Sequence, residues 1–236
     1  MSRRFAPVLA ALLFVAAPLP LLAPSAGADT FLILVSEDTS PYSFLPSLVR
    51  FNNPSAYTFR GEDEESGSQH EFETFLWFDV DASDIPAGHV LADAQLLVTW
   101  DFDAGGFGSG STAEAELNCH EVTEDWNETT LNWINRPAIG PAFDTVTGLT
   151  GFTSILCDAW PVVFDWIYND APNYGLALTN DSERAIGMHT LEADPSIPDG
   201  LKANLVLTTE LPEPGLGIGL AFGAMALAGL RRRERR

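Results

Sequence analysis

Short runs of alternating apolar and polar residues dominate the middle of the chain, and no long helical period appears there. The clearest run is Glu71–Val80, in which one set of alternating positions consists of Phe72, Thr74, Leu76, Phe78 and Val80. The other set consists of Glu71, Glu73, Phe75, Trp77 and Asp79. A half-buried β-strand requires this period of two, because successive side chains point to opposite faces of a sheet.

Similar runs, separated by Gly, Pro, Asn and Asp, recur along the chain. Ala113–Val122 alternates again, which places Ala113, Ala115, Leu117 and Cys119 on an inward face. We expect a turn at 84–88, one short helix at 162–168, and further strands at 31–35, 94–100, 175–179, 186–189 and 201–208. Many short strands with regular turns are typical of an all-β protein, here an antiparallel β-sandwich.

The formal net charge of −21 over 236 residues is distributed unevenly. Between positions 29 and 211 there are 31 acidic and five basic residues, the latter being Arg50, Arg60, Arg136, Arg184 and Lys202. This acidic segment repels nucleic-acid phosphates and the anionic head groups of membranes, which excludes nucleic acid as a partner. A hydrophobic content of 46% argues against disorder. A body of about 180 residues can bury roughly 70% of its unfolded surface, which supports a core.

The first 28 residues have the pattern of a secretory signal peptide. Arg3 and Arg4 precede the apolar stretch Phe5–Leu22, whose end is interrupted by prolines. The small-x-small pattern that signal peptidase requires ends at Ala28, which predicts cleavage before Asp29. The alternative is an uncleaved membrane anchor, against which the prolines and the cleavage pattern argue.

The last 25 residues have three parts in a fixed order. Pro212, Glu213 and Pro214 come first, an uncharged stretch at 215–230 follows, and the Arg-rich end 231–236 closes the chain. A helix over 215–230 would span about 24 Å, which is short against a core of about 30 Å. This tail resembles the PEP-CTERM sorting signal of bacterial surface proteins, and the resemblance implies processing by an exosortase. The alternative is an ordinary tail anchor.

These segments predict a simple organisation, with a signal peptide at 1–28, one domain at 29–211 and a sorting signal at 212–236. The arginines of 231–236 would stay cytoplasmic by the positive-inside preference, while the domain is exported. The chain would thus be anchored transiently in the inner membrane by a single transmembrane helix at 215–230. Its final place would be the cell surface or the extracellular polymer.

Cys119 and Cys157 are the two cysteines of the chain. An even number in an exported protein favours one disulfide bridge, and two separate free thiols are the alternative. A bridge would close a loop of 38 sequence steps, and the chain-entropy model gives it roughly 4 kcal/mol of stabilisation.

Several blocks of the domain resemble DNRLRE-type domains. They are Phe75–Val80 with the Ile85–Gly88 turn and Ala94–Leu96, then Trp126–Trp133 with Pro137, and finally Asp158–Trp166 and Asn173–Leu178. The residues that match the family motifs are Trp126, Glu128, Trp133, Pro137, Asn173, Tyr174 and Gly175. The resemblance implies a β-sandwich of jelly-roll type, and some members of the family are carbohydrate-binding modules, including alginate binders. The chain departs from the family in its N-terminal third, where the acidic segment 62–65 stands.

Two interpretations of the aromatic residues stay open. Trp126, Glu128 and Trp133 fit structural roles, because Trp buries a large area and Glu can accept hydrogen bonds from the backbone of a turn. Phe75 and Trp77 share one face of the expected strand 71–80, where they could form an exposed platform for sugar rings. The alternative is that a second layer buries both faces of that strand.

The sequence carries no recognisable catalytic motif, and its four histidines lack metal-ligand spacing. The segment Asp101–Gly106 starts like a calcium loop, but Gly105 and Thr112 depart from the required pattern. We therefore expect no cofactor, with a structural calcium ion elsewhere as the alternative. The resulting hypothesis is a non-catalytic, exported protein that associates with extracellular polysaccharide. The alternatives are a polysaccharide-active lyase or hydrolase and a purely structural surface module.

Overall fold

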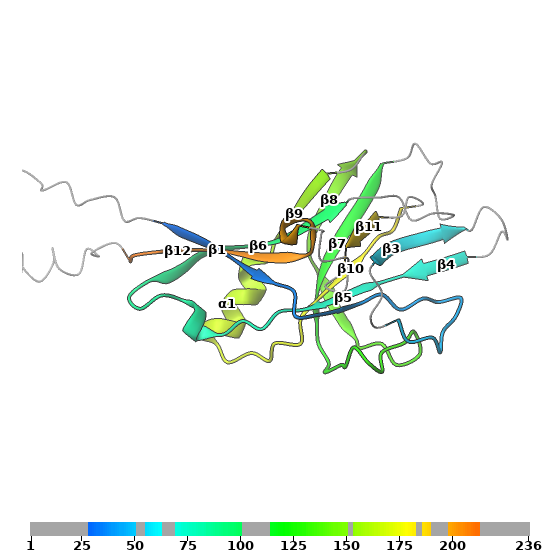
Figure 1. The fold of residues 1–236 in the computed structure, drawn as a ribbon, viewed down its shortest axis with the longest axis horizontal. Helices are drawn as coiled ribbons and strands as arrows, with labels where there is room; N and C mark the ends of the chain where they lie inside the picture. The colour runs from blue at the N-terminus through cyan, green and yellow to red at the C-terminus, as the bar shows by residue number, and fades with distance from the viewer. Residues whose placement is uncertain are drawn as a thin grey trace, which may run out of the picture.

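The computed structural model describes residues 28–50, 55–62, 69–100, 114–150, 153–182, 186–189 and 198–212 (Figure 1). The expected signal peptide up to residue 27, the calcium-like segment Asp101–Gly106, and Glu213 and Pro214 with the tail that follows lie outside the described residues. Within the described ranges, no helix combines the length and the apolar character needed to cross a membrane.

Antiparallel strands in three sheets form most of the described chain (Figure 1). The first sheet has the order β1 (Asp29–Leu34), β12 (Asn204–Glu210), β6 (Val90–Trp100) and β9 (Thr153–Asp158). The second has the order β2 (Glu37–Thr39), β5 (Thr74–Trp77), β10 (Leu176–Thr179), β7 (Ala115–Val122) and β8 (Ile139–Leu149). The third has the order β11 (Ile186–His189), β3 (Ser55–Glu62) and β4 (Gln69–Phe72). The predictions of an all-β protein and of antiparallel sheets are confirmed.

The two larger sheets contribute to one hydrophobic core. Alternate residues of β6, namely Leu96, Val98 and Trp100, are completely buried, as are Leu117 and Cys119 on β7. The inward face expected for the strand at 113–122 is therefore confirmed for its described positions. Burial of each large apolar side chain stabilises the fold by about 1.5–3 kcal/mol.

A disulfide bridge joins the two larger sheets. It links Cys119 on β7 to Cys157 on β9, and the two Cα atoms are 6.5 Å apart. Both residues are completely buried in the core that these sheets share. The bridge therefore ties strands that are 38 positions apart in the sequence and that hydrogen-bond within different sheets.

The helix α1 (Trp160–Tyr168) packs on the first sheet and begins two residues before the expected start. Pro161 lies in its first turn, where the missing N–H costs nothing and the fixed φ favours a helix. At its other end the Leu91 backbone N–H donates to the Tyr168 hydroxyl at 2.9 Å, which attaches the helix to β6. The buried face that α1 adds to the core consists of Val162, Val163, Trp166 and Ile167.

The short 3₁₀ helices η1 (Ala82–Asp84) and η2 (Asp199–Leu201) lie in connections. Asp81 caps η1, because its carboxylate accepts from the Ser83 N–H at 2.6 Å while the Asp84 carboxylate accepts from the Asp81 N–H at 2.9 Å. This capping box explains why the chain turns directly after β5 and reaches β6.

The single strand expected over Glu71–Val80 is wrong in extent, since the chain forms β4 and β5 with an interruption at Glu73. Glu73 is buried and forms an ion pair with Arg136 at 3.0 Å, so its side chain is held by a residue far along the sequence. The residues after Trp77 leave the sheet and enter the turn with η1. Alternation alone does not show such a break, because the apolar period continues through it.

Candidate functional site

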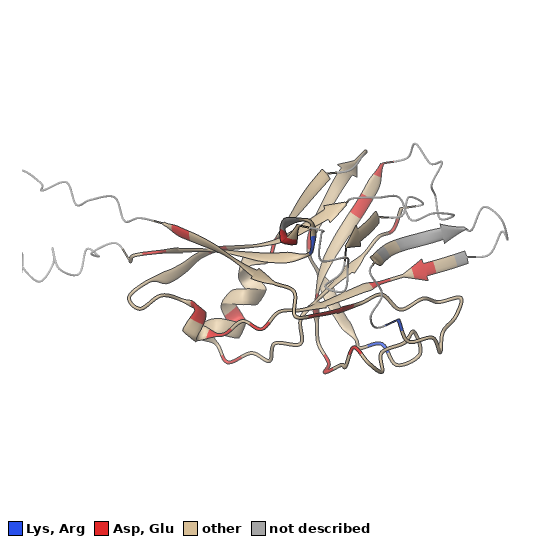
Figure 2. Cartoon of the chain, in the orientation of Figure 1, with Lys and Arg blue, Asp and Glu red and all other residues tan. Residues whose placement is uncertain are grey.

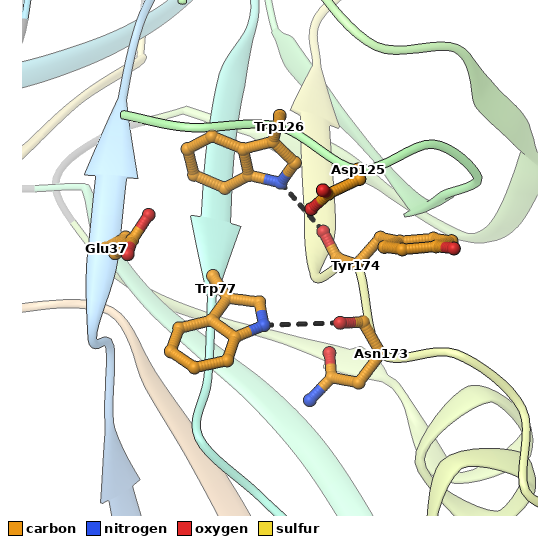
Figure 3. A pocket seen from close by; sticks show the side chains of 6 residues that line it. All are labelled: Glu37, Trp77, Asp125, Trp126, Asn173 and Tyr174. Carbon is orange, nitrogen blue, oxygen red and sulfur yellow. Dashed lines mark hydrogen bonds between the residues drawn. The ribbon is translucent and has the colours of Figure 1, made fainter. Parts of the chain in front are cut away.

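A pocket of about 240 Å³ opens where β2, β5, the loop after β7 and the turn before β10 meet (Figure 3). Its walls combine aromatic rings with carboxylate and amide groups, and they consist of Glu37, Trp77, Asp125, Trp126, Asn173 and Tyr174. Glu37 lies on β2 and Trp77 on β5, whereas the other four belong to the two connecting segments. Residues from four distant parts of the sequence thus form one concave surface.

Both indole rings are held by hydrogen bonds to the same short backbone segment (Figure 3). The Trp77 Nε1–H donates to the Asn173 carbonyl oxygen at 3.2 Å, and the Trp126 Nε1–H donates to the Tyr174 carbonyl oxygen at 2.8 Å. Each buried indole N–H therefore has an acceptor, as buried polar groups require. The bonds fix the orientation of both rings before any ligand arrives.

The segment Asn173–Gly175 has a geometry that requires its residue types. The Asn173 side chain donates to the Phe78 carbonyl oxygen at 2.8 Å and accepts from the Gly175 N–H at 3.1 Å. Gly175 has φ +88°, and a Cβ there would lie well inside 3.0 Å of the Leu76 carbonyl oxygen. Glycine is needed for both reasons, and the segment then places two carbonyl oxygens in front of the indoles.

The exposed platform of Phe75 and Trp77 is wrong for Phe75, which is completely buried. The face of β5 on which Phe75 lies is covered at this position, because residues from β7, β10 and the loop after β7 pack against the ring. The Trp126 ring contributes to this cover, with the ring centroids of Phe75 and Trp126 6.1 Å apart. Phe75 therefore supports the pocket from below, in a small core with Val122, Leu131 and Ala177.

The charged residues of the pocket are both acidic. Glu37 is half-buried and Asp125 is exposed, and no basic residue lies among those that line the pocket in the described part of the chain. Two described basic residues have acidic partners elsewhere, since Arg136 pairs with Glu73 and Lys202 with Asp199. Figure 2 shows acidic positions spread over the described body and few basic ones.

Trp133 belongs to a separate structural cluster. The Arg136 guanidinium lies 3.8 Å from the centroid of the Trp133 ring, donates to the Trp133 carbonyl oxygen at 2.8 Å and pairs with Glu73. Burial raises the pKa of the Glu73 carboxyl from its ordinary value of 4.5, although Arg136 opposes this shift. Pro137, the residue after Arg136, is buried. The cluster attaches the loop after β7 to the end of β4.

Glu128 lies half-buried in the turn at 128–130. In that turn the Asn127 side chain accepts from the Thr129 N–H at 3.0 Å, and the Asn127 carbonyl oxygen accepts from the Thr130 and Leu131 N–H groups at 3.1 and 2.9 Å. The sequence predicted this backbone role for Glu128 and did not assign one to Asn127. An Asn at the first position of a tight turn is a recognisable signal for such a role, because its side chain accepts from the backbone N–H two residues further on.

The motif residues thus separate into two groups in space. Trp77, Trp126, Asn173 and Tyr174 come together at the pocket with Gly175 beneath them, whereas Trp133 and Pro137 do not line it. Glu37 and Asp125 were not predicted from the sequence, because neither belongs to a motif and no local feature distinguishes them from the other acidic residues among the 31 between positions 29 and 211.

The expected processing sites lie next to the paired ends of the first sheet. Asp29 on β1 pairs with Thr209 on β12, so Ala28 directly precedes one of two neighbouring strand ends and Pro212 lies two residues beyond the other. As for metals, the described residues contain no group of three or more His, Cys, Asp or Glu side chains placed to hold an ion.

Comparison with models of protein families finds no family that matches the chain, and comparison with curated proteins finds no match either.

Proposed function

We propose that the chain is a non-catalytic, exported protein of the cell surface or extracellular matrix, which associates with exopolysaccharide through the pocket at Trp77 and Trp126. The observation that carries this proposal is the pocket itself, where two fixed indoles, a tyrosine and an asparagine lie beside two carboxylates. Aromatic faces stack on the C–H groups of sugar rings, and amides and carboxylates accept hydrogen bonds from hydroxyl groups.

Preorganisation supports the same proposal. A side chain that is already fixed loses little conformational entropy when a ligand binds, and both indoles are fixed by hydrogen bonds to the segment at 173–174. The volume of about 240 Å³ lies below the roughly 300–1,000 Å³ typical of sites for drug-sized ligands. A site of this size suits one sugar unit of a longer polymer.

Export and sorting belong to the proposal as well. A signal peptide would be removed before Asp29, and an exosortase would act at Pro212, Glu213 and Pro214 while a transmembrane helix at 215–230 holds the chain in the inner membrane. The antiparallel pairing of β1 with β12 supports this, because both ends of the domain leave it side by side (Figure 1). The jelly-roll type of the sandwich is part of the same proposal, supported by a chain that crosses between the two larger sheets from β5 to β6, from β6 to β7, from β8 to β9 and from β9 to β10.

The binding claim is tested with Trp77→Ala in affinity electrophoresis through gels that contain extracellular polysaccharide. We expect Trp77→Ala to lose most of its retardation, because the change removes one of the two fixed indole walls of the pocket. Phe44→Ala is the matched control, because Phe44 is 58% exposed and lies outside the pocket. Near-ultraviolet circular dichroism would verify that both variants are folded. Equal retardation of Trp77→Ala and the unchanged chain would contradict the proposal.

The non-catalytic part has its own test. The pocket holds the Glu37 and Asp125 carboxylates, and paired carboxylates are the usual groups of glycoside hydrolysis. Incubation of the chain with each polymer that it binds is expected to release no new reducing ends and no unsaturated product. Release of either product that is abolished by Glu37→Gln would contradict the non-catalytic proposal and would indicate a hydrolase or lyase.

A further inference from the structure

We propose that two copies of the chain associate through β1, whose free edge pairs antiparallel with β1 of the second copy. The pairing would join two four-stranded sheets into one sheet of eight strands. This inference goes beyond the proposed function and does not depend on polysaccharide binding, because β1 contributes no residue to the pocket.

The free edge of β1 is long and regular. Within the described part of the chain, β1 pairs with β12 alone, and its six residues keep one register against positions 204–209. Alternate backbone N–H and C=O groups of a strand point to either side, so those that point away from β12 have no partner strand in the described chain. The segment contains no proline, glycine or basic residue, and its single charge is Asp29 at its start.

The other edge strands of the described sheets have features that oppose such pairing. β9 is held against β8, where the Asp158 N–H donates to the Asp144 carboxylate at 2.8 Å. β8 contains Pro141 and pairs irregularly with β7. β2 has three residues, while β4 and β11 have four each. Proteins protect sheet edges by short strands, prolines, irregular pairing and covering contacts, so an unprotected edge of six residues indicates that a partner strand covers it.

The side chains of β1 fit a second strand of the same sequence. Phe31 and Ile33 pack against the core, whereas Leu32 and Leu34 are 55% and 39% exposed on the opposite face. An outer sheet face normally carries polar side chains, so two exposed leucines on one edge strand are an exception. Apolar side chains that lie opposite each other across two strands stabilise their pairing, and a second β1 would supply such partners.

The sequence of β1 favours a two-fold axis at Leu32. Residues directly opposite each other share a face, so Leu32 would contact Leu32 of the second copy and Phe31 would lie opposite Ile33. The two Asp29 carboxylates would then lie at opposite ends of the pair, whereas parallel pairing in register would place them side by side. This contact uses β1 of each copy once, so association ends at the dimer.

Cysteine cross-linking tests the position of the contact in the full-length chain. A neutral detergent is used, because the tails of an antiparallel pair leave it at opposite ends. Leu32→Cys places thiols where the two Cα atoms are expected about 4.5–5.5 Å apart, which a disulfide spans. We expect mild oxidation to convert most of this variant into a dimer on a non-reducing gel, while the native cysteines stay in their own bridge. Leu156→Cys is the matched control, since Leu156 is 53% exposed at the opposite edge of the same sheet, and it should give little dimer.

Sedimentation velocity over a range of concentrations measures the association of chains without an added cysteine. We expect a reversible equilibrium of monomer and dimer. Leu32→Lys should raise the dissociation constant at least about tenfold, because two ammonium groups would lie directly opposite each other at the axis. Leu156→Lys carries the same change in charge and should leave the constant unchanged. Added salt should strengthen the dimer, since two chains of formal net charge −21 repel each other.

Three outcomes would overturn the proposal. A monomer at all concentrations would exclude the dimer, and species larger than the dimer would exclude a closed two-fold pairing. Equal behaviour of the variants at Leu32 and Leu156, in cross-linking or in sedimentation, would show that any contact lies away from β1. None of these results bears on polysaccharide binding, which the retardation of Trp77→Ala tests separately.

Discussion

Replacement of Gly175 by alanine tests the structural basis of the pocket most severely. Gly175 has φ +88°, and an added Cβ would lie well inside 3.0 Å of the Leu76 carbonyl oxygen, which is a backbone atom of β5. Leu76 pairs with Leu176, so the clash acts directly on the pairing of β5 with β10. The chain can relieve it only when these two strands move apart.

The magnitude follows from two separate effects. A left-handed conformation costs an alanine about 1–2 kcal/mol, reduced by about 0.4–1 kcal/mol because alanine also restricts the unfolded chain. Separation of β10 from β5 at this pair would weaken one or two backbone hydrogen bonds, each with a net contribution of about 0.5–1.5 kcal/mol. We therefore expect a loss of about 0.5–4.5 kcal/mol, whose upper end is a large fraction of the roughly 5–15 kcal/mol that stabilises a typical domain.

Gly88→Ala provides the matched control. Gly88 has nearly the same conformation, φ +85°, but a Cβ there would meet no atom within 4 Å. Urea unfolding of both variants, followed by tryptophan fluorescence, should show a loss at Gly175 that exceeds the loss at Gly88 by about 0.5–3 kcal/mol. Equal losses would refute the argument that close approach to β5, rather than φ alone, requires glycine in the Asn173–Gly175 segment.

Two further predictions concern the core and the loop after β7. The double variant Cys119→Ala, Cys157→Ala should have a free energy of unfolding that is lower by roughly 4 kcal/mol. A thiol assay of the unchanged chain, unfolded without a reducing agent, should detect no free thiol, and two free thiols would contradict the bridge. Burial raises the folded-state pKa of Glu73 above 4.5, so the stability that this carboxyl contributes is present at low pH and is lost as pH rises through that higher pKa. The difference in unfolding free energy between the unchanged chain and Glu73→Gln should therefore decrease as pH rises above 4.5, and a difference that does not vary with pH would contradict the raised pKa.

The sequence predicted best where burial on one face leaves an alternating pattern. β7 has the expected inward residues, and the expected strand 186–189 has the bounds of β11. β8 was not predicted, because it contains Gly140, Pro141 and Gly148, has irregular pairing with β7 and leaves most of its side chains partly or fully exposed. β9 was not predicted either, since its three exposed alternate residues include Leu156, which obscures the period.

The site was predictable in part for a related reason. Four residues of the site were predicted because they match the motif pattern, namely Trp126, Asn173, Tyr174 and Gly175. The structure brings them together with Trp77. The burial of Phe75 depends on residues of β7, β10 and the loop after β7 that pack against its ring, and the local pattern does not contain them. Glu37 and Asp125 reach the pocket only through tertiary packing.

Nuclear magnetic resonance of the indole N–H groups tests the central claim most directly. The chain has six tryptophans, so a ¹⁵N-labelled sample gives six resolvable indole signals, which single Trp→Phe variants would assign. On titration with oligosaccharides of extracellular polysaccharide, the signals of Trp77 and Trp126 should shift together and saturate, while that of the completely buried Trp100 stays in place. Shifts confined to tryptophans outside the pocket, or no shift with any oligosaccharide, would contradict carbohydrate binding at this site.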